Sequence, residues 1–281
     1  MPLYRLDGPL PPLDDPVVVA AFDGWVDAGA AATTVLDLLG DGAPVVARFD
    51  SDELFDYRSR RPTLEIRDGR LSSLAWPEIT LRAARLGRRD VLVLTGAEPD
   101  DRWHRLAADT VELLGRLGVR QWISVGAIPA AVAHTRPVPV LGTASRAGLL
   151  RAGVGAGPDG LLKVPSAALS MLEMAAAEAG IPAVGYFAQI PHYVTGGYAL
   201  ASLELVRILE AHLEVDLPRG ELEEEGRLLR LRLDAAVAAD ETTRIYVERL
   251  ETMVDESRQP AGDDLIADIE RFLRERGRDE G

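Results

Sequence analysis

The sequence predicts an α/β fold with a largely parallel central sheet flanked by helices. Four short apolar runs rich in branched residues each precede a loop, and in three cases a helical pattern follows directly: Val17 to Phe22, Val91 to Thr95, Val119 to Val125 and Ala183 to Ile190. Runs that are apolar throughout are typical of strands buried on both faces. With 281 residues, 47% of them hydrophobic, the chain is long enough to bury a large core.

The first half of the chain begins with an arm, residues 1–16, that carries five prolines and is expected to be irregular. Asp27 is placed to cap a helix over about residues 28–39, which Gly40-Asp41-Gly42 ends, and a second strand follows at 45–49. Leu64 to Ile66, the Asp68-Gly69 turn and Leu71 to Trp76 predict a hairpin. The hairpin makes us expect a mixed sheet rather than a purely parallel one.

The second half alternates regularly between helices and strands. The predicted helices are Arg102 to Leu117, Ser166 to about Ala179, and Tyr198 to about Leu213. Gly155-Ala156-Gly157-Pro158-Asp159-Gly160 matches a dinucleotide-binding pattern by letter, but no strong strand precedes it and the next helix is distant. We therefore interpret Arg151 to Leu162 as a surface loop.

The composition changes after Gly220, which divides the chain into an arm (1–16), an α/β domain (17–219) and an acidic C-terminal helical segment (220–281). Residues 221–281 hold 18 acidic and 10 basic residues. One long helix is predicted from apolar residues at helical spacing, followed after Pro260 by a short amphipathic helix: Leu229, Leu233, Val237, Val247, Leu250 and Val254, then Leu265, Ile269, Phe272 and Leu273. These helices either pack on the sheet domain or each other, or form a partner-binding appendage.

The overall charge and the residue types exclude several classes of function. The formal net charge of −14 is unfavourable for binding nucleic acid or an anionic membrane. With no cysteine, disulfides and thiolate chemistry are impossible. We expect no membrane span and no secretory signal, and hence a cytoplasmic protein.

Candidate site residues gather in the loops that follow the predicted strands, because the carboxyl ends of parallel strands share one edge of a sheet. Twelve residues are ligand-binding candidates: Asp23, Trp25, Asp27, Glu98, Asp100, Arg102, Trp103, His134, Arg136, Gln189, His192 and Tyr193. Two of the carboxylates held close in a dry pocket would supply a general acid and base.

Several of these residues also have a structural explanation. Asp27 is placed to cap one helix, Asp100 or Asp101 to cap the next, and Asp23 to make a turn, so Glu98 is the acid that local structure explains least. Arg102 would clamp an anionic ligand or pair with the acids. His134 and His192 are candidates for acid/base work or for structural hydrogen bonds. No metal-ligand spacing or nucleotide motif is present, so we predict no metal and no cofactor.

The same loops resemble a known family. Gly24-Trp25-Val26-Asp27-Ala28-Gly29, Thr95-Gly96-Ala97-Glu98-Pro99-Asp100-Asp101-Arg102-Trp103, Val125-Gly126-Ala127-Ile128-Pro129 with His134-Thr135-Arg136-Pro137, and Gln189-Ile190-Pro191-His192-Tyr193 are similar to the PAC2 (proteasome assembly chaperone 2-like) family, in its actinobacterial branch. The resemblance covers about residues 15–215. It implies a purine-nucleoside-phosphorylase-like fold, homo-oligomers and a relation to chaperones of proteasome assembly. It implies no catalytic residues.

Two functional hypotheses follow. The first is a non-enzymatic, proteasome-linked assembly or scaffold protein. The second is a small-molecule enzyme or sensor with phosphorylase- or hydrolase-like chemistry on a nucleoside-like or carboxylate ligand at the strand-end loops.

The apolar residues of these loops predict self-association: Trp25, Trp103, Ile128, Pro129, Ile190 and Pro191. Together they would expose a larger apolar patch than a soluble monomer tolerates. We therefore expect a homotrimer with the loop edge near an interface, the alternative being a monomer in which the C-terminal helices cover the patch.

Overall fold

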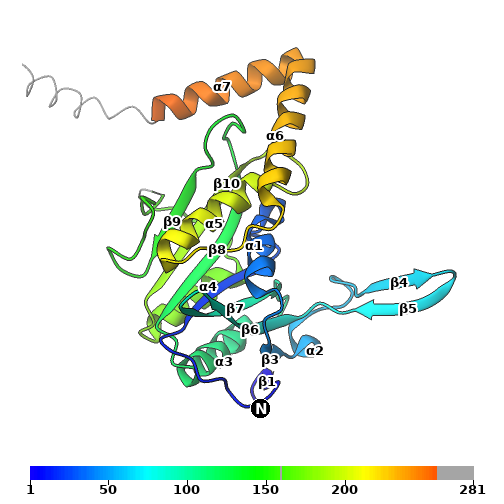
Figure 1. Cartoon of the computed structure of the whole chain (residues 1–281), viewed down its shortest axis with the longest axis vertical. Helices are drawn as coiled ribbons and strands as arrows, with labels where there is room; N and C mark the ends of the chain where they lie inside the picture. The colour runs from blue at the N-terminus through cyan, green and yellow to red at the C-terminus, as the bar shows by residue number, and fades with distance from the viewer. Residues whose placement is uncertain (159, 258–281) are drawn as a thin grey trace, which may run out of the picture.

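The computed structural model describes residues 1–158 and 160–257 and confirms the α/β class (Figure 1). Within the described residues, eight strands form the main sheet in the order β1-β3-β6-β7-β2-β8-β10-β9. Their bounds are Tyr4–Leu6 (β1), Val17–Asp23 (β2), Val45–Phe49 (β3), Ile79–Leu86 (β6), Arg89–Ala97 (β7), Gln121–Ala130 (β8), Val140–Ala144 (β9) and Ala183–Pro191 (β10). The short β1 lies in the arm that was expected to be irregular, and pairs with β3.

The sheet is parallel only in its centre. The four strands predicted as apolar runs, β7, β2, β8 and β10, are adjacent and parallel, and Val19 of β2 aligns with Val93 on one side and Ile123 on the other. Antiparallel strands flank them on both sides. Because only two residues separate Leu86 from Arg89, β6 and β7 form a hairpin and must be antiparallel. The sheet is therefore mixed, as expected, and its four central strands are parallel.

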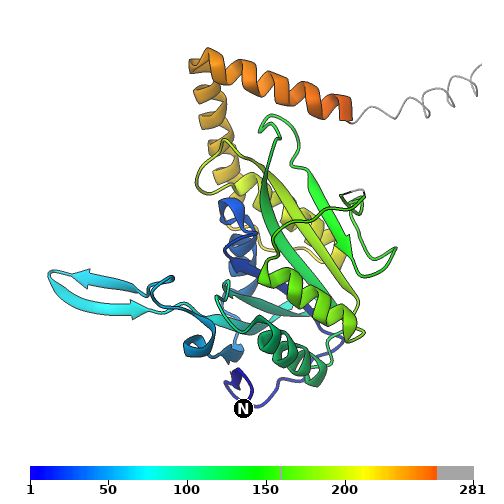
Figure 2. The same cartoon turned by 180° about the vertical axis from the view of Figure 1, so that it is seen from behind.

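Helices cover both faces of the sheet (Figures 1 and 2). The elements are α1 (Ala31–Gly40) and α5 (Ala199–Leu213) on one face, and α3 (Trp103–Arg116) and α4 (Ala168–Glu178) on the other. Alternate residues of β2 point to opposite faces, so Val18 and Val19 belong to two different hydrophobic cores. The parallel strands are buried on both sides for this reason.

The predicted hairpin forms, but it stands apart from the main sheet. Strands β4 (Thr63–Arg67) and β5 (Arg70–Ala75) make a separate two-stranded sheet that projects from the body beside the short helix α2 (Ser51–Leu54) (Figure 1). Asp68 and Gly69 both have positive φ, as a two-residue hairpin turn requires. The main sheet is thus mixed because of other strands, and not because of this hairpin.

The C-terminal segment contains two helices in place of the single long one that the sequence predicts. Helix α6 (Leu222–Ala239) packs on α5, and α7 (Glu241–Ser257) turns away to lie across the loops that follow β8 and β10 (Figure 1). Asp240 makes the break: its backbone is extended, and its carboxylate accepts a hydrogen bond from the Thr243 N–H at 2.8 Å. The predicted break at Pro260 and the short helix beyond it lie outside the described residues. Within the described residues, none of the helices has the length and apolar character that crossing a bilayer requires.

Candidate functional site at the strand-end edge

The twelve predicted residues lie in three separate groups along the carboxyl ends of the parallel strands. The first surrounds the end of β2, the second joins the loop after β7 to α2, and the third lies beyond β8 and β10, beneath the C-terminal helices. Each group has its own hydrogen-bonding partners, which identify what its side chains do.

In the first group, Asp27 binds the first turn of α1, whose N-cap residue is Ala30. Its carboxylate accepts hydrogen bonds from the N–H groups of Ala32 and Thr33 at 2.8 and 3.3 Å and from the Thr33 hydroxyl. Burial raises the pKa of Asp27, while these hydrogen bonds act in the opposite direction. Asp23 is exposed and forms an ion pair with Arg60 at 3.6 Å. The two acids therefore serve different purposes and do not share a dry pocket.

Glu98, the acid that local structure leaves unexplained, joins two distant segments. One carboxylate oxygen accepts a hydrogen bond from the Trp25 N–H at 2.9 Å, and the other accepts one from the Ala168 N–H at 2.8 Å. Ala168 is the first residue of α4, where a negative charge also interacts favourably with the helix dipole. Glu98 thus anchors the loop after β2 and the start of α4, while the Trp25 side chain remains 62% exposed.

The second group holds the loop after β7 against α2. Asp100 accepts a hydrogen bond from the Asp56 N–H at 3.0 Å, and Arg102 pairs with Glu53 at 2.8 Å. The Trp103 indole N–H donates to the Pro99 carbonyl oxygen at 2.7 Å. Asp100 is not the cap of α3, because the residue at that position is Arg102, in a left-handed conformation. These three residues fasten one loop to another.

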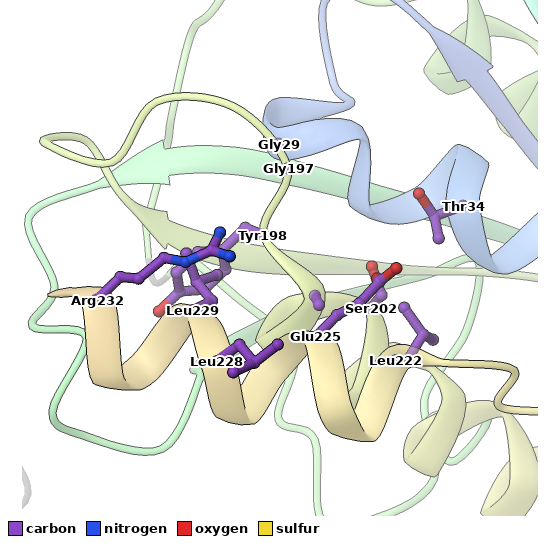
Figure 3. A pocket seen from close by; sticks show the side chains of 11 residues that line it. Gly29, Thr34, Gly197, Tyr198, Ser202, Leu222, Glu225, Leu228, Leu229 and Arg232 are labelled. Carbon is purple, nitrogen blue, oxygen red and sulfur yellow. The ribbon is translucent and has the colours of Figure 1, made fainter.

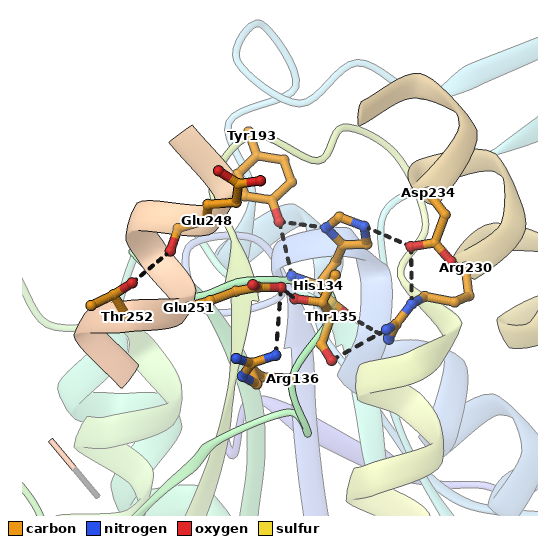
Figure 4. A network of polar contacts seen from close by, with 9 residues as sticks. All are labelled: His134, Thr135, Arg136, Tyr193, Arg230, Asp234, Glu248, Glu251 and Thr252. Carbon is orange, nitrogen blue, oxygen red and sulfur yellow. Dashed lines mark hydrogen bonds and ion pairs between the residues drawn. The ribbon is translucent and has the colours of Figure 1, made fainter. Parts of the chain in front are cut away.

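The third group contains a buried hydrogen-bonded chain from Tyr193 through His134 to Asp234 (Figure 4). The Tyr193 hydroxyl lies 2.7 Å from Nδ1 of His134, and Nε2 of the same ring lies 3.2 Å from a carboxylate oxygen of Asp234 on α6. His134 is 1% exposed. The histidine therefore lies between the loop after β10 and a helix that begins 88 residues later in the chain.

The hydrogen bonds also assign the protons in this chain. The backbone N–H of His134 donates to the Tyr193 oxygen at 2.8 Å, so the tyrosine O–H is left to donate to Nδ1, and Nε2–H donates to Asp234. Burial lowers the pKa of His134 and raises that of Tyr193. This hydrogen-bonded chain fastens α6 to the loop after β10.

Further contacts fasten both C-terminal helices to the same loops. Arg230 of α6 donates to the carbonyl oxygens of His134 and Thr135 at 2.6 and 3.2 Å. Glu251 of α7 accepts a hydrogen bond from the Thr135 hydroxyl and pairs with Arg136 at 3.5 Å (Figure 4).

His192 provides a second attachment for α7. Its Nδ1 lies 3.0 Å from the Ala130 carbonyl oxygen and its Nε2 lies 2.9 Å from the Tyr246 hydroxyl. Since the carbonyl can only accept, Nδ1 carries the proton and the tyrosine donates to Nε2. We call the four contributing helix residues the C-terminal latch: Arg230, Asp234, Tyr246 and Glu251.

The latch covers part of the edge that the sequence predicts to be exposed. Ile190 and Pro191 are buried and Trp103 is half-buried, which leaves Trp25 as the large apolar side chain of these loops that faces solvent. Gln189 lies in β10, and its backbone N–H donates to Pro139 at 2.8 Å. Ile128 is half-buried and Pro129 is exposed, so the apolar residues at this edge are only partly covered within one chain.

A pocket of about 320 Å³ lies beside the latch, where α6 crosses α1 and α5 (Figure 3). The residues that line it are Gly29, Thr34, Gly197, Tyr198, Ala199, Ser202, Leu222, Glu225, Leu228, Leu229 and Arg232. The twelve predicted residues are not among them. Sequence analysis missed this pocket and the latch because both depend on where α6 packs, although the polar residues within the apolar helical pattern, Arg230 and Asp234, were a signal.

The fold and this edge define an α/β protein with a mixed sheet in which two C-terminal helices lie over the loops that follow β8 and β10. A model of the PAC2 family matches residues 21–237. The chain belongs to the PAC2 family. The match ends within α6, so α7 lies beyond the part that the family model covers.

Three solved structures are similar over most of the chain. A protein of unknown function from Corynebacterium glutamicum is 29% identical with a TM-score of 0.86, covering 92% of this chain and 98% of that one. The Mycobacterium tuberculosis proteasome-assembly chaperone homologue is 32% identical with a TM-score of 0.75, covering 82% and 99%. A PAC2 family protein from Streptomyces avermitilis is 34% identical with a TM-score of 0.74, covering 83% and 100%. A comparison with curated proteins gave no match.

Proposed function

We propose that this chain is a non-enzymatic assembly or scaffold protein that acts on proteasome subunits. The observation that carries this proposal is that side chains at the strand-end edge are occupied in structural contacts: Asp27 and Glu98 bind backbone amides, and His134 binds the C-terminal latch. The likeness to a proteasome-assembly chaperone homologue, at 32% identity, supports the choice of partner.

The interaction element in this proposal is the pair of C-terminal helices, α6 and α7. Helix α7 buries only Val247 and Leu250 among its described side chains, while Ile245 and Met253 are 54% and 50% exposed. A helix that buries so little of its apolar surface has area left for a partner.

A pull-down with separate proteasome α and β subunits tests the proposal. The full chain should retain one of them at low salt, and a chain ending at Asp240 should lose it. Substituting Glu178→Gln, on the exposed end of α4, is the control and should leave capture unchanged. Failure of the full chain to retain either subunit would contradict the proposal.

A second function, ligand sensing or catalysis on a nucleoside-like or carboxylate ligand, is favoured by the pocket beside the latch. Tyr198 and Leu229 offer apolar surface there, and Arg232 has no carboxylate partner among the described residues. A thermal-shift screen of nucleosides and carboxylates is the test, because a ligand at a hundred times its dissociation constant adds about 2.7 kcal/mol of stability. The shift should disappear in Arg232→Gln, and a screen without any shift would count against this function.

We also propose that the chain forms a homotrimer, with the hairpin of β4 and β5 as its contact. Every residue of both strands is exposed. Four large apolar side chains occur in two cross-strand pairs, Leu64 with Leu74 and Ile66 with Leu71. An isolated two-stranded hairpin is marginal in water, so a neighbouring subunit is the natural cover for this surface.

Light scattering tests the oligomer. The full chain should have three times the 30.3 kDa mass of one subunit. Substituting Ile66→Arg together with Leu71→Arg should reduce the measured mass to that of one subunit, because the contact would have to bury charges. Ser73→Arg, opposite Glu65 on the other face of the hairpin, should keep the trimer. A single-chain mass for the unmodified protein would exclude self-association.

A further inference from the structure

A hollow of about 490 Å³ lies at the opposite edge of the sheet, where the parallel strands begin. Its lining residues are Asp15, Val17, Arg89, Arg120, Gln121, Arg146, Leu149, Arg151 and Pro182. Val17 and Gln121 are the first residues of β2 and β8, and Pro182 precedes β10. This site is therefore separate from the strand-end edge and from the C-terminal latch.

The hollow concentrates positive charge in a chain whose net charge is −14. Of its four arginines, Arg120 pairs with Asp15 at 2.7 Å. Arg89 donates to the Leu213 carbonyl oxygen, and Arg151 donates to carbonyl oxygens of its own loop. Within residues 1–158 and 160–257, Arg89, Arg146 and Arg151 form no ion pair with a carboxylate. Most other arginines of the described residues do form one.

A buried relay orients one more donor toward the same hollow. The Arg151 backbone N–H donates to the Tyr186 hydroxyl at 3.0 Å, so the tyrosine O–H donates to Nδ1 of His212 at 2.7 Å. Nε2–H of His212 must then donate to Oε1 of Gln121 at 3.1 Å. The amide oxygen of Gln121 is thereby occupied, and its NH₂ group is left to donate into the hollow that this residue lines.

We propose that this hollow binds a compact anion with at least two negative charges, such as a phosphate-bearing metabolite or a polycarboxylate. Three guanidinium groups and one oriented amide offer donors, and the single carboxylate present is already neutralised by Arg120. Guanidinium groups bind phosphate and carboxylate oxygens in pairs. Val17, Leu149 and Pro182 form the apolar part of its lining.

Isothermal titration calorimetry on the full chain, with inorganic pyrophosphate and with citrate as separate probes at low salt, tests this site. We expect saturable binding of at least one probe with one site per chain. Saturation by pyrophosphate alone assigns a phosphate ligand, and by citrate alone a carboxylate ligand. Arg146→Gln should weaken binding at least about tenfold without affecting the fold, because Arg146 is exposed and makes no hydrogen bond or ion pair within the described residues.

Two further variants separate a built site from general charge attraction. Gln121→Glu keeps an acceptor for His212 but places a negative charge in the hollow, and should abolish binding. Arg70→Gln, on the tip of the hairpin, changes the net charge equally and should bind as the unmodified chain does. Absence of saturable binding by both probes, or equal weakening in Arg146→Gln and Arg70→Gln, would overturn the proposal.

Discussion

Single carboxylates in this protein hold segments together that are far apart in sequence. Glu98 lies 73 residues from Trp25 and 70 from Ala168, yet it accepts a backbone N–H from each. Hydrogen bonds to an ionised group contribute more than neutral ones, and leaving a buried N–H without an acceptor costs about 1–3 kcal/mol. The stability of the fold should therefore be sensitive to this one side chain.

Glu98→Gln is expected to lower the free energy of unfolding by about 1–3 kcal/mol, because one amide N–H would face the NH₂ of the new side chain. Urea denaturation measures the change. Glu178→Gln, at the exposed end of α4, is the control and should change stability by less than about 0.5 kcal/mol. Equal effects of the two substitutions would show that Glu98 has no special role.

His212 should make stability depend on pH. Burial, with the nearby charges of Arg151 and Arg89, lowers its pKa to about 4, from an ordinary value of 6.5. Below pH 6.5 the unfolded chain binds a proton at His212 that the folded chain does not. The contribution of neutral His212 to the free energy of unfolding is therefore fully present above pH 6.5 and is lost as the pH falls toward 4. The full difference corresponds to about 3 kcal/mol.

Substituting His212→Gln is the test of this pH dependence. Between pH 6.5 and 4, the unfolding free energy of the variant should fall less steeply than that of the unmodified chain, by up to about 1.4 kcal/mol per pH unit. His104, exposed on α3, is the control, and His104→Gln should leave the slope unchanged. Identical slopes for all three proteins would mean that His212 titrates normally in the folded state.

At the scale of elements, the placement of α6 depends on a glycine. A Cβ atom at Gly226 would lie 3.1 Å from Leu203 Cδ1 and 3.2 Å from Leu200 Cδ2, both on α5. The helix approaches α5 closely because this position has no side chain. The same approach brings Arg230 and Asp234 within reach of the loop after β8.

Gly226→Leu should push α6 away from α5 and destabilise the protein by about 1–3 kcal/mol, through overpacking. Gly115→Leu is the matched control, since nothing lies within 4 Å of its Cβ position in α3, and leucine should stabilise that helix by a few tenths to about 0.8 kcal/mol. Thermal unfolding followed by circular dichroism measures both. A rise in melting temperature for Gly226→Leu would mean that α6 is not closely packed.

At the scale of the whole molecule, the two C-terminal helices differ in how far they belong to the core. Leu222 of α6 is 3% exposed and lies in the same hydrophobic cluster as β2 and α5, and Leu229 and Leu233 pack against it. Helix α7 instead joins a small cluster formed by Ala133, Val247 and Leu250. Removing residues 221–281 would therefore also remove the contacts that α6 makes with this core.

A chain ending at Asp240 should keep the circular dichroism spectrum of the sheet domain. Its free energy of unfolding should fall by about 1–3 kcal/mol, which lowers the melting temperature by only a few degrees. A chain ending at Gly220 should lose more stability, because it lacks Leu222 and its neighbours, which pack in the core between the sheet and α5. Thermal unfolding compares the two directly. If both truncations have the same effect, α6 contributes no more to the core than α7 does.

The sequence by itself determined the features that depend on neighbouring residues. Each of the four central strands contains one of the predicted apolar runs, the Asp68-Gly69 turn is correctly placed, and Asp27 lies five residues before the Ala32 N–H that it binds. Side-chain periodicity and turn chemistry act over such short distances, so they are visible in a single sequence. The family resemblance rests on the same loops.

Only the tertiary structure decided which strands flank the parallel centre, that the hairpin stands apart, and that the C-terminal segment is two helices fastened over the strand ends. His134 meets Asp234 across 100 residues, and Glu98 meets Ala168 across 70. Such contacts form because the folded chain brings together polar groups that burial would otherwise leave without partners. No local pattern encodes that pairing, and for this reason the same residues that resemble a catalytic set in the sequence hold loops and helices in the structure.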